Sequence, residues 1–187
     1  MQTRDNLLGA TPVSPLSLRS VAHPGIYAWW DVEGALSQSW PDDFPEVDTA
    51  IPLYIGIAAK QNLSARVEDM HLANTRRSAL RRSLAPLLSE SLDLTRGAVR
   101  HPRAGKFGLE LEQEAHLTNW MLANLRMTWV GHDESGDVEK PILRNLWPPL
   151  NDLSATGSPY RVPMRVLRAT FRASAPLKWT PSAERSV

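Results

Sequence analysis

Two short apolar segments separated by a polar stretch dominate the first third of the chain. Residues 25–32, GIYAWWDV, are rich in β-branched and aromatic residues, and residues 51–58, IPLYIGIA, are almost continuously apolar. Such segments are typical of β-strands, and the second is expected to be buried on both faces. The residues between them contain several acids and two prolines, which predicts a surface loop. Strands joined in this way are expected to pair antiparallel.

After the second strand, the apolar residues are spaced as in α-helices. Residues 62–73 predict a helix with Asn62 as its N-cap. A second helix is predicted over residues 76–92, where four leucines repeat at i, i+4, i+7 and i+8. Pro86 within that segment indicates a kink or an early end.

Two further helices are predicted on either side of a third strand. Residues 109–125 predict a helix and residues 126–130 a short alternating strand. Residues 138–147 predict the last helix of this set, with Asp137 as its N-cap and Pro141 in its first turn. The order strand, strand, helices, strand, helix predicts an α+β fold, a small antiparallel three-stranded sheet flanked by helices.

The two ends of the chain show less regular patterns. Residues 1–23 are interpreted as an irregular lead-in, and one domain is expected over residues 24–152. Residues 153–187 are interpreted as an extended basic C-terminal tail, in which MRVLRATF is a short strand or a helix. A length of 187 residues suits one domain with an appendage better than two full domains.

The composition excludes several kinds of site. The chain has no cysteine, which rules out disulfides, zinc–thiolate centres and a cysteine nucleophile. No apolar run is long enough to cross a bilayer, and the first 20 residues lack a signal-peptide core. A cytoplasmic protein without a membrane partner is therefore expected.

The net charge of +1 hides an uneven distribution along the chain. Residues 27–59 hold six acids and no lysine or arginine, whereas residues 60–106 hold ten basic residues against four acids. Residues 107–139 hold one basic residue against seven acids, and residues 140–187 hold eight against two. These blocks indicate either a phosphate-binding face or ordinary solvated helix faces, and charge alone leaves both open.

One pair of tripeptides suggests a family. GIY at residues 25–27 followed by YIG at residues 54–56 resembles the signature of the GIY-YIG nucleases. Two further segments follow in the family's order. NLSARV at 62–67 is similar to the first helix of that fold, and EKPILRNLWPPLN at 139–151 is similar to a later helix that begins near a glutamate and runs into P-x-N. The resemblance covers about residues 24–152.

The resemblance implies that Tyr27 is a general base and that Tyr54 orders the water or the phosphate. A tyrosine has a pKa of about 10, so it acts as a base at neutral pH only where its neighbours favour the phenolate. The alternative is a pair of core tyrosines, because the sequence leaves open the strand register that would bring the rings together. Gly56 either lets the backbone come close to the substrate or to a helix, or marks a bend in the strand.

Arg66, His71, Glu139 and Asn151 complete the implied site. The forked guanidinium of Arg66 suits a phosphate, and Glu139, with waters and a substrate phosphate, suits Mg²⁺, with Mn²⁺ as the alternative ion. His71 follows Arg66 by five residues, which on an ideal α-helix turns it away, so a local distortion or an indirect role is expected. Asn151 is expected to bond the backbone and hold the helix end.

Basic residues outside this group are candidates for contacts with a nucleic-acid backbone. They would supply affinity rather than sequence reading, and their alternative role is solubility. Three tryptophans, Trp29, Trp30 and Trp120, are favoured as core residues over base-stacking surfaces. The basic candidates are Lys60, Arg76, Arg77, Arg81, Arg82, Arg100, Arg103 and Lys106.

The resemblance implies a metal-dependent endonuclease that hydrolyses phosphodiester bonds by a one-metal mechanism, and by analogy with the family DNA is favoured over RNA. No separate sequence-reading domain is recognised, so a protein partner that supplies specificity fits this interpretation. Two alternatives stay open. One is a catalytically inactive nucleic-acid-binding module of the same fold, and the other is a regulatory subunit whose basic tail contacts a protein. The sequence does not predict an oligomeric state.

Overall fold

The computed structural model describes residues 2–97, 106–132, 135–151 and 157–174 of the chain. None of the helices in these ranges has the length and apolar character of a membrane span. In chain order the elements are α1 (Gln2–Gly9), the 3₁₀ helix η1 (Pro15–Ser20), β1 (Gly25–Trp30), β2 (Tyr54–Ala58), α2 (Leu63–Arg66), the π-helical turn η2 (Val67–His71), α3 (Ala79–Leu87), α4 (Leu111–Asn124), β3 (Arg126–Gly131), α5 (Ser135–Leu146) and α6 (Arg161–Ala173).

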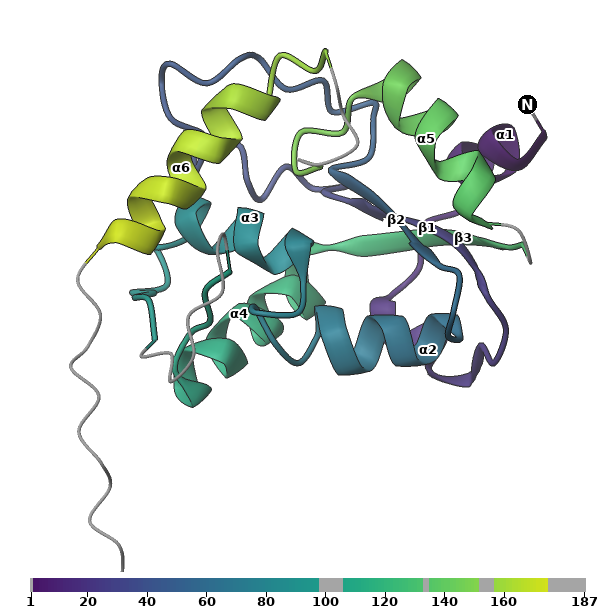
Figure 1. Cartoon of the computed structure of the whole chain (residues 1–187), viewed down its shortest axis with the longest axis horizontal. Helices are drawn as coiled ribbons and strands as arrows, with labels where there is room; N and C mark the ends of the chain where they lie inside the picture. Colours follow the sequence, from purple (N-terminus) through teal and green to yellow (C-terminus); the bar gives the residue numbers. More distant parts are fainter. Residues whose placement is uncertain (1, 98–105, 133–134, 152–156, 175–187) are drawn as a thin grey trace, which may run out of the picture.

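A three-stranded antiparallel sheet lies at the centre of the molecule (Figure 1). The order is β2-β1-β3, so β1 is central and β2 lies at an edge. Tyr27 lies opposite Gly56, and Trp29 lies opposite Tyr54. Because side chains alternate along a strand, this register points Tyr27 and Tyr54 to the same face of the sheet. The predicted α+β fold with its small antiparallel sheet is confirmed.

Each face of the sheet is covered by its own set of helices. The face that carries Tyr27 and Trp29 packs against buried residues of α2, α3 and α4. The opposite face, with Ile26 and Ala28, packs against α1 and α5. Figure 1 shows α1 and α5 on one side of the strands and α2 and α4 on the other. Helices α1 and α5, which are far apart in sequence, therefore share one face of the sheet, opposite α2, α3 and α4.

Helices α2 and α3 each begin at a side chain that caps the helix N-terminus. The side chain of Asn62 accepts the backbone N–H of Ala65 at 2.8 Å, which confirms the predicted cap of α2. The side chain of Ser78 caps α3 by accepting the N–H of Arg81 at 3.1 Å, so the helix starts later than the predicted residue 76. The four leucines predicted to share one face of α3 are all buried.

Helix α5 begins earlier than predicted. It starts at Ser135, so the expectation that Asp137 is the N-cap was wrong. Pro141 lies inside the helix rather than in its first turn. A proline there removes one helical hydrogen bond. The neighbouring Ile142 and Leu143 offset this loss because they are buried against the sheet.

The N-terminal segment is more ordered than the predicted irregular lead-in. It contains α1 and η1, and Val13 exchanges two backbone hydrogen bonds of 2.8 Å with Met127 of β3. The N–H of Leu63, at the start of α2, donates to the carbonyl of His23 at 3.0 Å. The segment thus satisfies a helix N-terminus that α2 could not satisfy alone.

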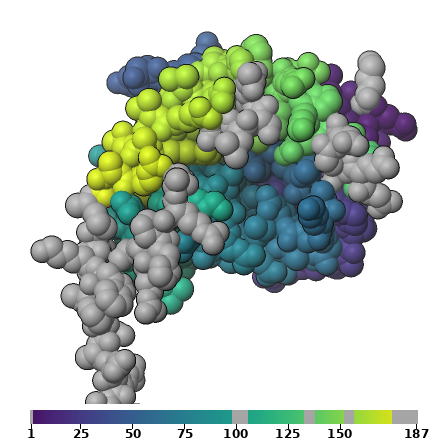
Figure 2. Space-filling view, in the orientation of Figure 1, coloured from purple at the N-terminus to yellow at the C-terminus, as the bar shows by residue number. Residues whose placement is uncertain are grey.

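The first part of the predicted basic tail forms α6, the helical one of the two alternatives for that segment. Met164 and Phe171 are buried against the domain, and α6 lies against α3. The guanidinium of Arg168 donates to Ser83 of α3 and to the carbonyl of Leu150. Figure 2 shows the atoms of α6 continuous with the body of the molecule.

A buried ion pair joins α3 to α4. Arg81 is fully buried, and its Nη2 lies 2.6 Å from a carboxylate oxygen of Glu114. The same carboxylate accepts the N–H and hydroxyl of Thr75, and Nη1 of Arg81 donates to the carbonyl of His71 at 3.1 Å. The prediction that Arg81 binds nucleic acid was therefore wrong, because its guanidinium is buried and paired with the carboxylate of Glu114.

We predict that Arg81→Met destabilises the protein by about 3–5 kcal/mol, because it leaves the buried carboxylate of Glu114 without its cation. Arg77→Met is the matched control, since Arg77 is exposed and the same change there should stay within about 0.5 kcal/mol. Urea unfolding measures both. Equal effects of the two substitutions would contradict the assignment of Arg81 to the core.

Candidate active site

The hydroxyl of Tyr27 lies at the centre of a buried polar group. It is 2.6 Å from Nε2 of His71, and it accepts the Nε–H of Arg66 at 3.0 Å. Tyr27 and His71 are fully buried, whereas Arg66 is half-buried. Three of the residues implied by the sequence thus meet at one oxygen atom.

A π-helical turn brings His71 to this oxygen. Helix α2 ends at Arg66, and the chain continues as η2, in which the N–H of Leu72 bonds the carbonyl of Val67 at 2.8 Å, five residues earlier. The wider turn rotates each residue less than an α-helix does, so a residue five positions on returns to the same side. This is the local distortion that the spacing of Arg66 and His71 requires.

Aromatic rings surround the imidazole of His71. The rings of Tyr27, Trp29 and Tyr54 meet it edge-on, with centroids 5.4, 5.7 and 5.7 Å away. Nδ1 of His71 lies 2.8 Å from the hydroxyl of Ser78, the residue that caps α3. Both ring nitrogens are therefore engaged, and the ring cannot rotate without losing a buried hydrogen bond.

Burial decides where the protons of this group reside. It lowers the pKa of His71 well below its usual value, and the charges of Arg66 and two further arginines act in the same direction. Burial raises the pKa of Tyr27, as does the charge of Tyr54, while Arg66 opposes that rise. At neutral pH the tyrosine is protonated and the histidine is neutral, so the phenol can donate a hydrogen bond to Nε2 of the imidazole.

The glycines of the two tripeptides are required by close approaches. A Cβ on Gly56 would lie 2.6 Å from Cζ of Tyr27, whose ring crosses over β2 at that position. A Cβ on Gly25 would collide with the carbonyl of Val130 in β3 and touch a methyl of Leu63 at 3.0 Å. Gly56 therefore makes room for the catalytic candidate itself, rather than for a helix or a bend.

Glu139 approaches the same group from α5, on the other side of the sheet. Its side chain is half-buried, and burial raises the pKa of its carboxyl, while the charges of Arg66 and Lys140 oppose that rise. The carboxylate in turn raises the pKa of Tyr27 and of Tyr54, so its field acts on both rings. Glu139 thus lies within electrostatic reach of the tyrosine pair.

The donor set around Glu139 fits a hard divalent cation held mainly by water. In the described part of the chain no three His, Cys, Asp or Glu side chains gather in one place. Mg²⁺ is commonly held by one or two carboxylates, with waters and substrate phosphates as its other ligands. A half-buried carboxylate whose charged form is disfavoured by burial also gains when a cation approaches.

Asn151 bonds the outer edge of β2. Its Oδ1 accepts the N–H of Ile55 at 2.8 Å, and its Nδ2 donates to the carbonyl of Ile55 at 2.7 Å. The side-chain amide thus replaces a fourth strand at that position. The neighbouring Leu150 donates its N–H to the carbonyl of Leu53 at 2.9 Å. These bonds fix the strand on both sides of Tyr54.

The remaining basic candidates fall into three groups. Lys60, Arg77 and Lys106 are exposed, and Arg76 and Arg82 are half-buried. The charge of Arg82 lowers the pKa of Tyr54, which is otherwise raised by burial, so Arg82 lies on the side of the tyrosine pair. The predicted Arg100 and Arg103 lie outside the described residues.

Ser78 is a site residue that sequence reasoning did not single out. A serine directly before a helical pattern signals an N-cap, and this signal was available. Its second contact, with Nδ1 of His71, depends on the tertiary placement of α3 against η2. Trp29 is fully buried, and Trp30 and Trp120 are half-buried, in agreement with the preference for core roles.

We predict that Gly56→Ala destabilises the protein by about 1–3 kcal/mol, because the new methyl group displaces the ring of Tyr27. Gly9→Ala in α1 is the control, since a Cβ there meets no atom within 4 Å. Thermal unfolding of both variants tests the prediction. A Gly56 variant as stable as the Gly9 variant would show that the ring does not require this space.

The buried His71 should make stability depend on pH. In the unfolded chain it gains a proton near pH 6.5, whereas the folded protein resists protonation until lower pH. Stability should therefore fall as the pH drops below about 6.5, by up to about 1.4 kcal/mol per pH unit. His71→Asn should remove that part of the slope, and His116→Asn, at an exposed position, should retain it. Urea unfolding between pH 5 and 7.5 measures the slopes, and identical slopes in all three proteins would refute the assignment.

Comparison with known proteins places this arrangement in a family. The GIY-YIG catalytic domain model matches residues 25–165, which include every candidate from Tyr27 to Asn151 and reach into α6. No curated protein and no solved structure matches the chain significantly. The matched span covers more than half of the 187 residues. The chain therefore belongs to the GIY-YIG nuclease family.

Proposed function

We propose that this protein is a Mg²⁺-dependent endonuclease of the cytoplasm that hydrolyses phosphodiester bonds, with DNA as its substrate. The observation that carries the proposal is the meeting of Arg66 and His71 at the hydroxyl of Tyr27, within reach of the charge of Glu139. A proton acceptor, a permanent cation and a hard oxygen ligand are the groups that phosphodiester hydrolysis needs.

Glu139 is the residue that would hold the metal ion, with Mn²⁺ as the alternative to Mg²⁺. When bound, the ion would supply Lewis-acid stabilisation of the negative charge that grows on the phosphate oxygens. Arg66 would stabilise the same charge through its forked guanidinium. The half-buried position of Glu139 strengthens its interaction with a cation, because fewer waters compete for the carboxylate.

His71 gives Tyr27 a route to act as a base although its pKa is raised. The phenol would pass its proton to Nε2 of His71, 2.6 Å away, while its oxygen takes a proton from the attacking water. Arg66 only donates hydrogen bonds, so its contact with the same oxygen favours the developing phenolate. Tyr54, beside the same imidazole, would order the water or the phosphate.

A basic surface would hold the nucleic acid around this site. Lys60, Arg76, Arg77 and Arg82 lie in the segment that follows YIG, and they would contact backbone phosphates. Arg100, Arg103 and Lys106 extend the same basic block in sequence. DNA is favoured over RNA by analogy with the family. Such contacts carry no sequence information, so specificity would come from substrate structure or from a protein partner.

A second candidate is a nucleic-acid-binding module that retains the fold without the reaction. The specific observation in its favour is that Tyr27 is fully buried with its hydroxyl bonded to two side chains. In that case the polar group would serve stability alone. A regulatory role for the basic tail would instead predict little or no salt-dependent binding to nucleic acid.

Cleavage assays on single-stranded, duplex and branched DNA and on RNA, with and without Mg²⁺, test the proposal. Tyr27→Phe, Arg66→Ala and Glu139→Ala should each reduce the cleavage rate by at least about a hundredfold. Glu112→Ala, an exposed glutamate of α4, is the control and should cut at the wild-type rate. Gel mobility measurements of all four variants separate lost binding from lost chemistry.

One outcome would count against the enzyme, and another against the assignment of its base. Salt-dependent binding without cleavage in Mg²⁺ or Mn²⁺ would favour the inactive module. Wild-type cleavage by Tyr27→Phe would show that the tyrosine is not the base, even if the protein is a nuclease.

A further inference from the structure

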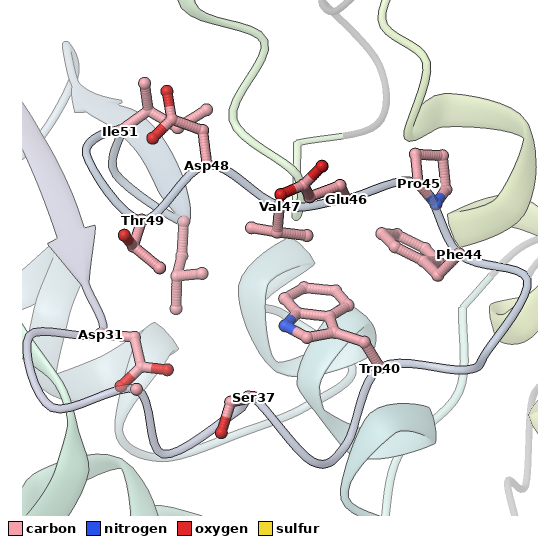
Figure 3. A pocket seen from close by; sticks show the side chains of 12 residues that line it. Asp31, Ser37, Trp40, Phe44, Pro45, Glu46, Val47, Asp48, Thr49 and Ile51 are labelled. Carbon is pink, nitrogen blue, oxygen red and sulfur yellow. The ribbon is translucent and has the colours of Figure 1, made fainter.

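The long connection between β1 and β2 encloses a pocket of its own. The cavity has a volume of about 260 Å³. Figure 3 shows the indole of Trp40 at the centre of its lining. The other apolar walls come from Phe44, Val47, Ile51 and Leu53, while Asp31, Glu46 and Asp48 contribute carboxylates.

Contacts within the connection hold the pocket open. The carboxylate of Asp31 accepts the N–H groups of Ala35 and Leu36 at 2.7 and 2.8 Å, which fixes the first turn. The ring of Phe44 stacks on Trp40 at 4.8 Å and on Tyr160 at 5.9 Å. The walls are thus built before any ligand arrives, which lowers the ordering cost of binding.

The start of α6 secures the other side of the connection. The hydroxyl of Tyr160 donates to the carbonyl of Glu46 at 2.8 Å, and the carboxylate of Asp48 accepts the N–H of Ala50 at 2.8 Å. The carboxylate of Glu46 takes no part in these bonds that shape the loop. A change at that carboxylate should alter the charge of the pocket rather than its form.

The electric field around the pocket is negative. Residues 27–59 contain six acids and no lysine or arginine. Burial raises the pKa of Tyr160, and the charges of Asp48 and Glu46 add to that rise. A nucleic-acid backbone is repelled by such a surface, whereas a cationic group is attracted to it. A ligand of this pocket would therefore carry positive charge, unlike the substrate of the nuclease site.

The volume of the cavity suits one large side chain better than a cofactor, since drug-sized ligands fill about 300–1,000 Å³. We propose that this pocket binds an arginine side chain presented by a basic segment of a partner protein. The guanidinium would stack on the indole of Trp40, its stem would lie against Val47, and the carboxylate of Glu46 would pair with its charge. A lysine lacks the planar group that stacks on an aromatic ring, so arginine is preferred.

A partner held there would lie next to the strand that carries Tyr54. Leu53 lines the pocket and directly precedes Tyr54, and its N–H donates to the carbonyl of Trp29 at 2.8 Å. The acidic connection and the basic segment that begins at Lys60 lie on either side of β2 in sequence. The protein-binding and phosphate-binding surfaces would thus be built from segments that precede and follow one edge strand in sequence. This inference stands apart from the proposed catalytic function, because peptide binding needs no cleavage.

Fluorescence anisotropy with the whole protein tests the proposal. The probe is a labelled peptide of sequence GLRRLG, and its twin GLQQLG carries glutamine in place of arginine. The arginine peptide should bind saturably and at least about tenfold more tightly than its twin. Glu46→Gln should weaken binding several-fold, and Trp40→Ala should weaken it further. Glu33→Gln is the matched control, because Glu33 is an exposed acid of the same connection that does not line the pocket.

Three results would overturn the proposal. Equal affinity for the two peptides would exclude an arginine site. Equal weakening by Glu33→Gln and Glu46→Gln would show attraction to the overall charge of the loop. Self-association in analytical ultracentrifugation that Glu46→Gln abolishes would assign the pocket to a second copy of this chain. Thermal unfolding of each variant confirms that the protein remains folded, and Glu46→Gln gives the decisive comparison if Trp40→Ala does not fold.

Discussion

The contact between the buried hydroxyl of Tyr27 and Nε2 of His71 sets the requirements that the surrounding structure meets. A separation of 2.6 Å demands that the imidazole reach the sheet, and the π-helical turn η2 provides that reach. It also demands space beneath the phenol ring, which the missing side chain of Gly56 leaves free. The cap of α3 then engages the other imidazole nitrogen through Ser78, and Arg81 bonds the carbonyl of His71. Secondary structure, core and site therefore depend on one another.

The charges around this pair of rings act on their protons in different ways. Burial favours the protonated phenol and the neutral imidazole, and hydrogen bonds are stronger in such a low-dielectric interior. A proton can move between them only if the resulting phenolate is stabilised. Arg66 lies close enough to do this, and the charge of Glu139 acts in the opposite sense. Neutralisation of Glu139 by a divalent cation would remove that opposition. The arrangement is consistent with a site that becomes reactive only when it is assembled.

The sequence predicts the sheet, most of the helices and the chemical types at the site, because these depend on local pattern and on the spacing of the two tripeptides. It could not predict the register that places Tyr27 over Gly56, which depends on packing across three strands. The spacing of Arg66 and His71 indicates either a local distortion or an indirect role for His71, but it does not identify the distortion as the π-helical turn η2. Arg81 has the sequence context of a surface arginine, and only the placement of Glu114 on α4 identifies it as a core residue.

The distribution of charge gains a physical meaning once the fold is known. In the sequence alone, the charge blocks are compatible with solvated helix faces. One arginine of the basic block, Arg81, does not reach the surface at all, because it is buried in an ion pair with Glu114. The acidic block, however, forms a walled pocket, and the basic block that follows β2 leads from the tyrosine pair into α3. A strand of five residues, held at its outer edge by Asn151, lies between the two blocks in sequence. Because phosphates are repelled by the acidic block and attracted to the basic one, this distribution would favour nucleic acid near Arg66 and a cationic partner at the acidic pocket.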